Sequence, residues 1–250
     1  NEACNVVAEY IAGDIPSFVA LMNAQAAALG MTGTHFANAH GLHDENHYTT
    51  VRDLVTLARW AWQSEQFQEF STQTSHTVPA TNKSEERVLR TTNYLTSGQT
   101  VGKYYYDKAR GVKTGFTDDA GRCLVSAAER DGMTLICVTL DAQDDWNLHA
   151  SLYDQCFQDY SMQPLPQSPA SVTLAGGELQ QNGIEQELML SPAWQARVPL
   201  KKGESARLER DLLCEPFVYA PSSPQQVYAR AVYALDGQTL CEVPMVAAGE

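Results

Sequence analysis

The chain has 250 residues, of which 44% are hydrophobic and 19% are charged, so it has enough apolar material for one large folded domain or two smaller ones. Its formal net charge of −13 at pH 7, without clusters of Lys and Arg, argues against nucleic acid as a partner, because phosphate binding depends on such clusters. It contains no run of apolar residues long enough to predict a membrane-spanning helix.

The first part of the chain predicts two helices in succession. Residues 3–12 are typical of a short buried helix that ends at Gly13. Asp14 is a helix-capping residue, and Pro16 suits the first turn of the helix that follows. We expect this second helix to end at Gly30.

A third helix is predicted after Thr50. Thr50 and Asp53 form a variant of the capping box, and apolar residues then recur at helical spacing to Trp62. The pair Arg52-Asp53 is therefore interpreted as capping and ion pairing rather than as catalytic. Residues 74–106 are expected to be irregular and to contain strands.

The tripeptide Lys113-Thr114-Gly115 lies on a predicted strand that leads into a β-hairpin. The hairpin strands are 122–127 and 134–140, and the turn between them contains Asp131-Gly132, in which glycine supplies a positive φ. A closing helix is expected to start at Asp144, because apolar residues then recur at spacings of three and four as far as Tyr160.

The composition changes at the proline-rich segment 163–169, which predicts a domain boundary. Short β-favouring runs follow, including 171–174 and 227–233. Turn signals at Gly176-Gly177, Lys202-Gly203 and Asp236-Gly237 separate such runs. We therefore divide the chain into a domain over residues 1–162 and a β-rich C-terminal domain over residues 163–250.

No metal, cofactor or redox site is predicted. The six cysteines show no Cys-x-x-Cys spacing, which argues against zinc and redox motifs, and whether Cys214 pairs with Cys241 stays open. Asp44 to His47 form the densest run of possible metal ligands, but no second cluster supports it. His40 is interpreted as a structural residue of its loop.

Five motifs in order resemble one protein family. They are segments 1–13, Leu29 to Leu42 (LGMTGTHFANAHGL), Thr49 to Leu54 (TTVRDL), Thr92 to Leu95 (TNYL) and Gly111 to Thr117 (GVKTGFT). The family is that of the serine-type D-alanyl-D-alanine carboxypeptidases, the low-molecular-mass penicillin-binding proteins. The resemblance runs from Asn1 to about Tyr160 and is weaker beyond, where Pro199 to Gly203 are similar to a turn of the family's C-terminal domain.

The resemblance implies a mixed α/β (α+β) fold. The first domain would be of the penicillin-recognising serine transferase and β-lactamase-like type, with a five-stranded antiparallel sheet flanked by helices. The second would be a small all-β domain.

The resemblance also assigns roles to six residues. Lys113 would supply positive potential and help to protonate the leaving amine, and Asn1 would contact the substrate amide as a second catalytic residue. Thr114 and Thr117 would offer hydroxyls to the substrate carboxylate. Gly115 would let a peptide lie against the strand edge, and the Phe116 N–H would be one oxyanion donor.

The chain departs from the family pattern at the nucleophile. The family's catalytic serine lies in Ser-x-x-Lys, upstream of a Ser-x-Asn motif, and no serine here is followed by lysine three positions later. If Asn1 is the asparagine of Ser-x-Asn, the chain opens within a catalytic motif. We expect the nucleophile to lie outside the given chain.

Three functions are therefore compared. The favoured one is a serine D-Ala-D-Ala carboxypeptidase that acts on peptidoglycan peptides through an acyl-enzyme, binds β-lactams and works outside the cytoplasm of a bacterium, in the cell envelope. The alternatives are a related serine β-lactamase, which the β-rich extension fits poorly, and a non-catalytic peptidoglycan-binding scaffold. Membrane association would depend on an anchoring segment that is not in this chain.

Overall fold

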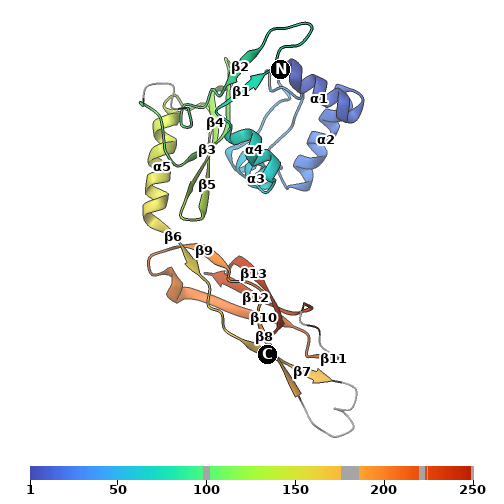
Figure 1. Ribbon diagram of the computed structural model, residues 1–250, viewed down its shortest axis with the longest axis vertical. Coiled ribbons are helices and arrows are strands. Elements are labelled where there is room, and N and C mark those ends of the chain that lie inside the picture. Colours follow the sequence, from blue (N-terminus) through green and yellow to red (C-terminus); the bar gives the residue numbers. More distant parts are fainter. Residues whose placement is uncertain (98–101, 176–185, 220–222, 224, 249–250) are drawn as a thin grey trace. The chain divides into compact units, whose positions relative to one another are not determined.

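The computed structural model describes residues 1–97, 102–175, 186–219, 223 and 225–248. The chain forms two compact units, Asn1–Cys156 and Phe157–Glu250 (Figure 1). The predicted domain boundary, between residues 162 and 163, falls within β6 (Tyr160–Pro164). The assignment of separate domains to residues 1–162 and 163–250 stays a prediction. The predicted turn at Gly176-Gly177 lies outside the described residues.

The first two helices have the predicted ends. Helix α1 (Glu2–Ala12) stops at Gly13, which has a left-handed φ of 86°. Helix α2 (Ile15–Ala28) begins after Asp14, whose carboxylate accepts a hydrogen bond of 2.7 Å from the Ser17 N–H. Both capping signals in the sequence are thus confirmed.

The prediction that α1 is buried is wrong. Ala8 is its one buried residue, whereas Val6, Tyr10 and Ile11 are 65%, 90% and 59% exposed. In the described part of the chain α1 packs chiefly against α2, so only one face of the helix is covered. The apolar residues of a helix predict that it can pack against other segments, but they do not identify which of its faces are covered.

Helix α3 (Val51–Ala61) starts at Thr50, whose hydroxyl accepts a 3.1 Å hydrogen bond from the Asp53 N–H. The Asp53 carboxylate does not complete a reciprocal capping box. It accepts hydrogen bonds from the Gly33 N–H at 2.9 Å and the Thr34 hydroxyl at 2.7 Å, and so ties the preceding loop to the helix. Helix α4 (Glu65–Thr72), which the sequence did not predict, follows.

Strands β1 (Ser75–Val78) and β2 (Arg87–Arg90) form a hairpin. Strands β3 (Ala109–Thr117), β4 (Gly121–Arg130) and β5 (Met133–Thr139) form an antiparallel sheet in that order. Asp131 and Gly132 have φ values of 53° and 78°, as the predicted β4–β5 turn requires.

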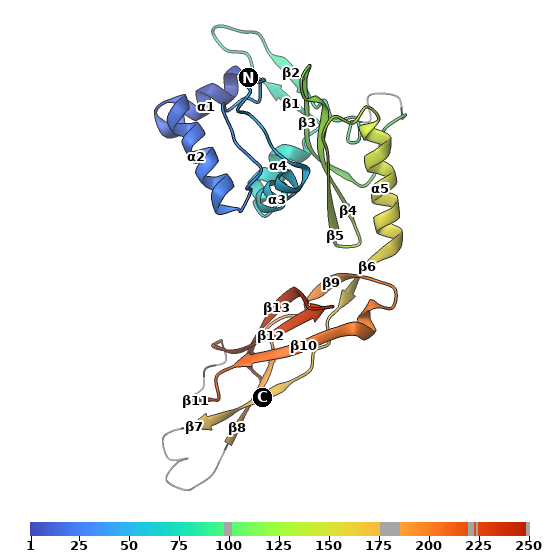
Figure 2. The same ribbon diagram turned by 180° about the vertical axis from the view of Figure 1, so that it is seen from behind.

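Helices cover both faces of this sheet. Helices α3 and α4 lie on one face, and α5 (Asp145–Asp159) lies on the other (Figures 1 and 2). The mixed α+β class is therefore confirmed. Within the described residues the sheet has three strands, whereas the resemblance implied five.

The second unit is built from strands, as predicted. Its main sheet has the order β10-β12-β13-β8-β7-β11, and a second pairing joins β6 to β9. The members of the main sheet are β7 (Ala170–Ala175), β8 (Gln186–Pro192), β10 (Leu208–Cys214), β11 (Phe217–Tyr219), β12 (Val227–Leu235) and β13 (Gln238–Ala247). The short 3₁₀ helix η1 (Glu204–Arg207) follows β9 (Arg197–Lys201) and the turn at Gly203. Buried Leu190, Tyr233 and Met245 lie at the centre of its core.

A buried polar network joins β4, β5 and α5. Ser126 and His149 are both fully buried, and the Ser126 hydroxyl lies 2.7 Å from His149 Nδ1 and 2.6 Å from the Tyr153 hydroxyl. The Thr139 hydroxyl lies 3.0 Å from His149 Nε2. Burial lowers the pKa of His149 to about 4, although nearby Asp145 acts in the opposite direction.

We expect this network to make stability depend on pH. The pKa of His149 rises to an ordinary 6.5 on unfolding, so the unfolded chain takes up the proton first as the pH falls. The contribution of His149 to the free energy of unfolding is thus fully present above pH 6.5. It falls by about 2 to 3 kcal/mol between about pH 6.5 and 4. Urea unfolding of the wild type and of His149→Gln at pH 7.5 and 4.5 measures this contribution. A stability gap between the two proteins that is equal at both pH values would contradict it.

Candidate active site

Strand β3 presents the Lys-Thr-Gly motif at an edge of its sheet. Gly111, two residues before Lys113, has a φ of 105°, and a Cβ added there would lie 2.5 Å from the Ser71 carbonyl oxygen. Glycine is therefore required by both the backbone conformation and the close approach of the end of α4. This contact fixes where the motif begins relative to the helix.

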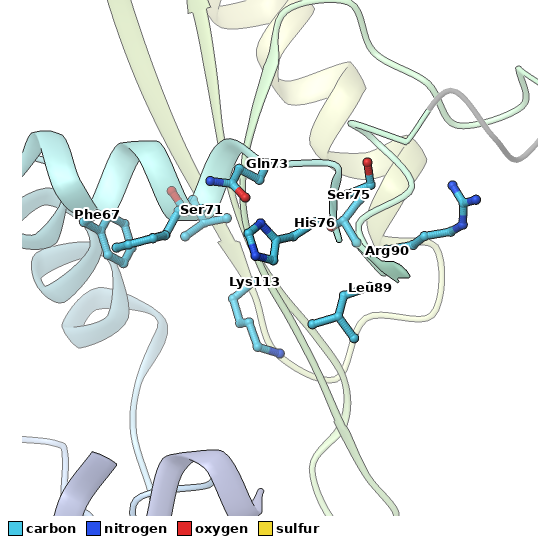
Figure 3. Close-up of a pocket in the computed structure, with 11 residues that line it drawn as sticks. Phe67, Ser71, Gln73, Ser75, His76, Leu89, Arg90 and Lys113 are labelled. Carbon is cyan, nitrogen blue, oxygen red and sulfur yellow. The ribbon is translucent and has the colours of Figure 1, made fainter. Parts of the chain in front are cut away.

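Lys113 lines a cavity of about 520 Å³ between α4, the β1–β2 hairpin and β3 (Figure 3). Phe67 and Phe70 of α4 form its apolar side, while His76 of β1 and Arg90 of β2 lie on the hairpin side. Figure 3 shows the Lys113 side chain extending from the strand on the same side as Leu89.

The charge on the lining of this cavity is opposite in sign to the net charge of the chain. Lys113 is its cationic side chain, and no described Asp or Glu lines it, although the net charge of the chain is −13. Arg90 also lines it, but its guanidinium extends away from Lys113 (Figure 3). The Lys113 ammonium donates a hydrogen bond of 2.5 Å to the Thr114 carbonyl oxygen, so it stays beside the strand edge. A cavity lined by a cation and by no described carboxylate favours an anionic group over a cationic one.

The other motif residues differ in their surroundings. Thr114, Gly115 and Phe116 line a second cavity of about 270 Å³. The Thr114 and Thr92 hydroxyls are 2.6 Å apart, which links the motif to the TNYL segment. The Thr117 hydroxyl accepts a 3.0 Å hydrogen bond from the Ala120 N–H, so it also closes the β3–β4 turn.

Asn1 is the N-cap residue of α1, and its side chain makes no capping hydrogen bond. In both overall views the N-terminus lies beside the β1–β2 hairpin, which also forms part of the Lys113 cavity (Figures 1 and 2). The β1–β2 hairpin is thus next to the N-terminus in Figures 1 and 2 and is also part of the lining of the Lys113 cavity. The role of Asn1 stays a prediction.

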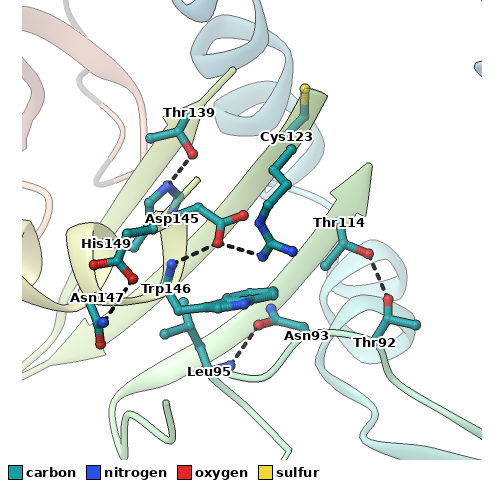
Figure 4. A network of polar contacts seen from close by, with 12 residues as sticks. Thr92, Asn93, Leu95, Thr114, Cys123, Thr139, Asp145, Trp146, Asn147 and His149 are labelled. Carbon is teal, nitrogen blue, oxygen red and sulfur yellow. Dashed lines mark hydrogen bonds and ion pairs between the residues drawn. The ribbon is translucent and has the colours of Figure 1, made fainter. Parts of the chain in front are cut away.

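The sequence analysis missed a cluster beside the second cavity. Arg122 of β4 donates a 2.7 Å hydrogen bond to Asp145 Oδ1, and its guanidinium lies 5.4 Å from the centre of the Trp146 ring (Figure 4). Asp145 is 2% exposed. One signal was available: Arg122 directly follows the Gly121 turn, and hairpin pairing places it opposite Phe116.

Other candidate sites gain no support. All six cysteines are free thiols, including Cys214 and Cys241, and burial raises the pKa of Cys137 to about 11, which keeps that thiol protonated. Among the described residues there is no group of three His, Cys, Asp or Glu side chains that could hold a metal. No helix in the described part of the chain has the length and apolar character needed to cross a bilayer.

The profile of the D-alanyl-D-alanine carboxypeptidase family matches residues 1–144, which include the whole Lys-Thr-Gly hairpin. The chain belongs to this family. It is 30% identical to the D-alanyl-D-alanine carboxypeptidase DacF of Bacillus subtilis over 99% of its own length, and 28% identical to DacC of Escherichia coli over 98%. It spans 62% and 59% of the lengths of these two relatives.

Solved structures agree with this membership at the level of the fold. The peptidoglycan synthesis regulatory factor PBP3 of Streptococcus pneumoniae superposes with a TM-score of 0.73 at 20% identity, covering 97% of this chain and 72% of that one. Penicillin binding protein 5 of Haemophilus influenzae gives a TM-score of 0.67 at 22% identity, with 100% and 70% covered. Both matches extend over the first unit and the β-rich unit.

Proposed function

We propose that this chain is part of a bacterial serine D-Ala-D-Ala carboxypeptidase. The observation that carries the proposal is the exposed Lys113 on an edge strand, beside a cationic cavity, in a chain of this family. The enzyme would remove the terminal D-Ala from peptidoglycan peptides and would also be acylated by β-lactams. It would act outside the cytoplasm, in the cell envelope.

The reaction would pass through an ester. The hydroxyl of an upstream Ser-x-x-Lys serine attacks the carbonyl carbon of the penultimate D-Ala, and the serine proton passes through the lysine of that motif to the leaving amine. Water then cleaves the ester and restores the serine. Lys113 adds positive potential and supports protonation of the leaving amine through the serine of Ser-x-Asn.

The remaining motif residues hold the substrate. Asn1 contacts its amide, Thr114 and Thr117 offer hydroxyls to its carboxylate, and the Phe116 N–H stabilises the oxyanion together with the nucleophile's own N–H. Among the described residues strand β3 pairs with β4 alone, so its outer backbone groups are available to an extended peptide.

Two competing functions are less well supported. The superpositions on two penicillin-binding proteins cover 100% and 97% of this chain, so they include the β-rich unit, which a β-lactamase would leave unexplained. A non-catalytic scaffold would need no Lys113 beside a cationic cavity. The scaffold would explain why these residues contain no Ser-x-x-Lys, but a nucleophile outside the given chain explains it equally well.

Release of D-alanine tests the proposal directly. The intact gene product that contains this chain is incubated with a peptide ending in D-Ala-D-Ala and with a matched peptide ending in D-Ala-L-Ala. We expect free D-alanine from the first peptide and no hydrolysis of the second. A folded, intact protein that releases nothing from the first peptide would exclude the carboxypeptidase.

Gly115→Ala separates substrate binding from stability. A Cβ at Gly115 would meet Cys123 Cβ at 3.6 Å, an ordinary contact, so we expect unfolding free energy to change by less than about 1 kcal/mol. The methyl group would nevertheless displace a peptide lying along the strand, and we expect kcat/KM to fall about 100-fold. Full activity in this variant would show that the peptide does not lie against β3.

A further inference from the structure

The Lys113 cavity is larger than the terminal D-alanine of the proposed substrate requires. Its volume of about 520 Å³ falls within the range of about 300–1,000 Å³ that is typical of small-molecule pockets. The side chain of D-alanine is a single methyl group, which would leave most of this space unfilled. The proposed reaction therefore gives no role to the walls of the cavity.

Apolar side chains from three elements form much of these walls. They are Phe67 and Phe70 of α4, Leu89 of β2 and Val112 of β3. Phe70 and Leu89 are 66% and 53% exposed. In the view of Figure 3, Phe67 lies on one side of Lys113 and Leu89 on the other. Exposed apolar side chains that gather around one cavity are typical of a binding site, because a ligand can cover them.

Lys113 connects these walls to the reaction. Its ammonium donates a hydrogen bond of 2.5 Å to the Thr114 carbonyl oxygen, which keeps it beside the strand that would bind the peptide. In the proposed reaction Lys113 supports protonation of the leaving amine, and that amine belongs to the C-terminal residue of the substrate. The side chain of this residue would therefore lie close to Lys113 and within reach of the apolar walls.

The charge of the cavity restricts which side chain it accepts. Lys113 is cationic, and no described Asp or Glu lines the cavity. A second ammonium would be repelled by Lys113 and would find no described carboxylate as a partner. An apolar side chain has neither disadvantage, and it covers the exposed walls.

We propose that the Lys113 cavity binds the side chain of the substrate's C-terminal residue, and that the enzyme removes D-residues with bulky apolar side chains, such as D-leucine, as well as D-alanine. This inference rests on the proposed carboxypeptidase function and extends its substrate class. Lys113 then serves the acyl transfer, while Phe70 and Leu89 determine which terminal residue is accepted.

The test compares three peptides that differ only in their last residue, using the intact gene product. They end in D-Ala-D-Ala, D-Ala-D-Leu and D-Ala-D-Lys, and release of the terminal amino acid is measured for each. For the wild type, kcat/KM for the D-leucine peptide should at least equal that for the D-alanine peptide. It should exceed that for the D-lysine peptide about tenfold, because leucine and lysine are similar in length but only lysine brings a second cation.

Two variants locate the selectivity in this cavity. Leu89→Ala and Phe70→Ala should each lower the ratio of kcat/KM for the D-leucine peptide to that for the D-alanine peptide about fivefold. Because both side chains are largely exposed, the fold should persist, and if one variant does not fold the other decides the question. Val88→Ala is the matched control: Val88 precedes Leu89 on β2 and is 49% exposed, but it does not line the cavity. It should keep the wild-type ratio.

The outcomes separate this inference from the proposed function. A wild type that prefers D-alanine to D-leucine, or that does not distinguish D-leucine from D-lysine, would overturn the inference while the carboxypeptidase stands. Folded Leu89 and Phe70 variants that keep the wild-type ratio would do the same. A wild type that hydrolyses none of the three peptides would remove the proposed function, and with it this inference.

Discussion

Replacing Lys113 with alanine is expected to lower the rate of acylation by penicillin, and kcat/KM for D-alanine release, about 10³-fold in the intact gene product. The Lys113 ammonium is the motif's cation in the cavity between α4 and the β1–β2 hairpin, and no neighbouring side chain on β3 replaces it. Because the side chain is exposed, the fold should persist. Stopped-flow acylation with a fluorescent penicillin, alongside circular dichroism, measures both quantities.

Lys83→Ala is the matched control. Lys83 is an exposed lysine in the loop between β1 and β2, so its removal changes the net charge equally without touching the cavity lining. Its acylation rate should equal that of the wild type. If Lys113→Ala is acylated as fast as Lys83→Ala, Lys113 has no part in acyl transfer.

Gly111→Ala is expected to lower the free energy of unfolding by about 3 kcal/mol. Two costs combine at this position: the φ of 105° disfavours any side chain, and the new Cβ would lie 2.5 Å from the Ser71 carbonyl oxygen. The strand and the end of α4 must separate to accommodate it. Urea unfolding monitored by tryptophan fluorescence measures the loss.

Gly132→Ala separates the free-energy cost of the backbone conformation from that of the contact with Ser71. Gly132 also has a positive φ, of 78°, but a Cβ there meets nothing within 4 Å. We expect a loss of about 1 kcal/mol, because only the backbone conformation is penalised. Equal losses in the two variants would mean that the approach of Ser71 to β3 does not constrain the protein.

Local signals in the sequence predicted much of the first unit. Asp14 and Thr50 cap their helices with side-chain hydrogen bonds, Gly13 ends α1, and Asp131-Gly132 turns the hairpin. Each of these features depends on the conformation of a few neighbouring residues, which is why the sequence reports it directly. The β-rich character of residues beyond 163 followed from turn spacing in the same way.

Features that depend on distant partners were not predictable. The exposure of Tyr10 and Ile11 depends on which segments pack against α1. The prediction of five strands was taken from the family as a whole, whereas this chain spans about 60% of the length of the relatives it matches. Arg122 and Asp145 are 23 residues apart in sequence and meet only because α5 folds back on the sheet. The cavity beside Thr114 therefore became apparent only in three dimensions.

The motif itself was predicted, but its surroundings were not. Lys113 and Thr114 were singled out from sequence, yet neither the cavity that Lys113 lines nor the contact between Thr114 and Thr92 could be derived from it. Residue types indicate what chemistry is available. The register between β3 and β4 decides which side chains share a face.

Intact-mass spectrometry of the natural gene product, with and without a penicillin, tests the central claim most directly. We predict a mass above the 27.5 kDa of this chain, a gain of one covalent penicillin, and an adduct that peptide mapping places on a serine upstream of Asn1. A folded protein that gains no penicillin, or that carries the adduct within these 250 residues, would contradict the account.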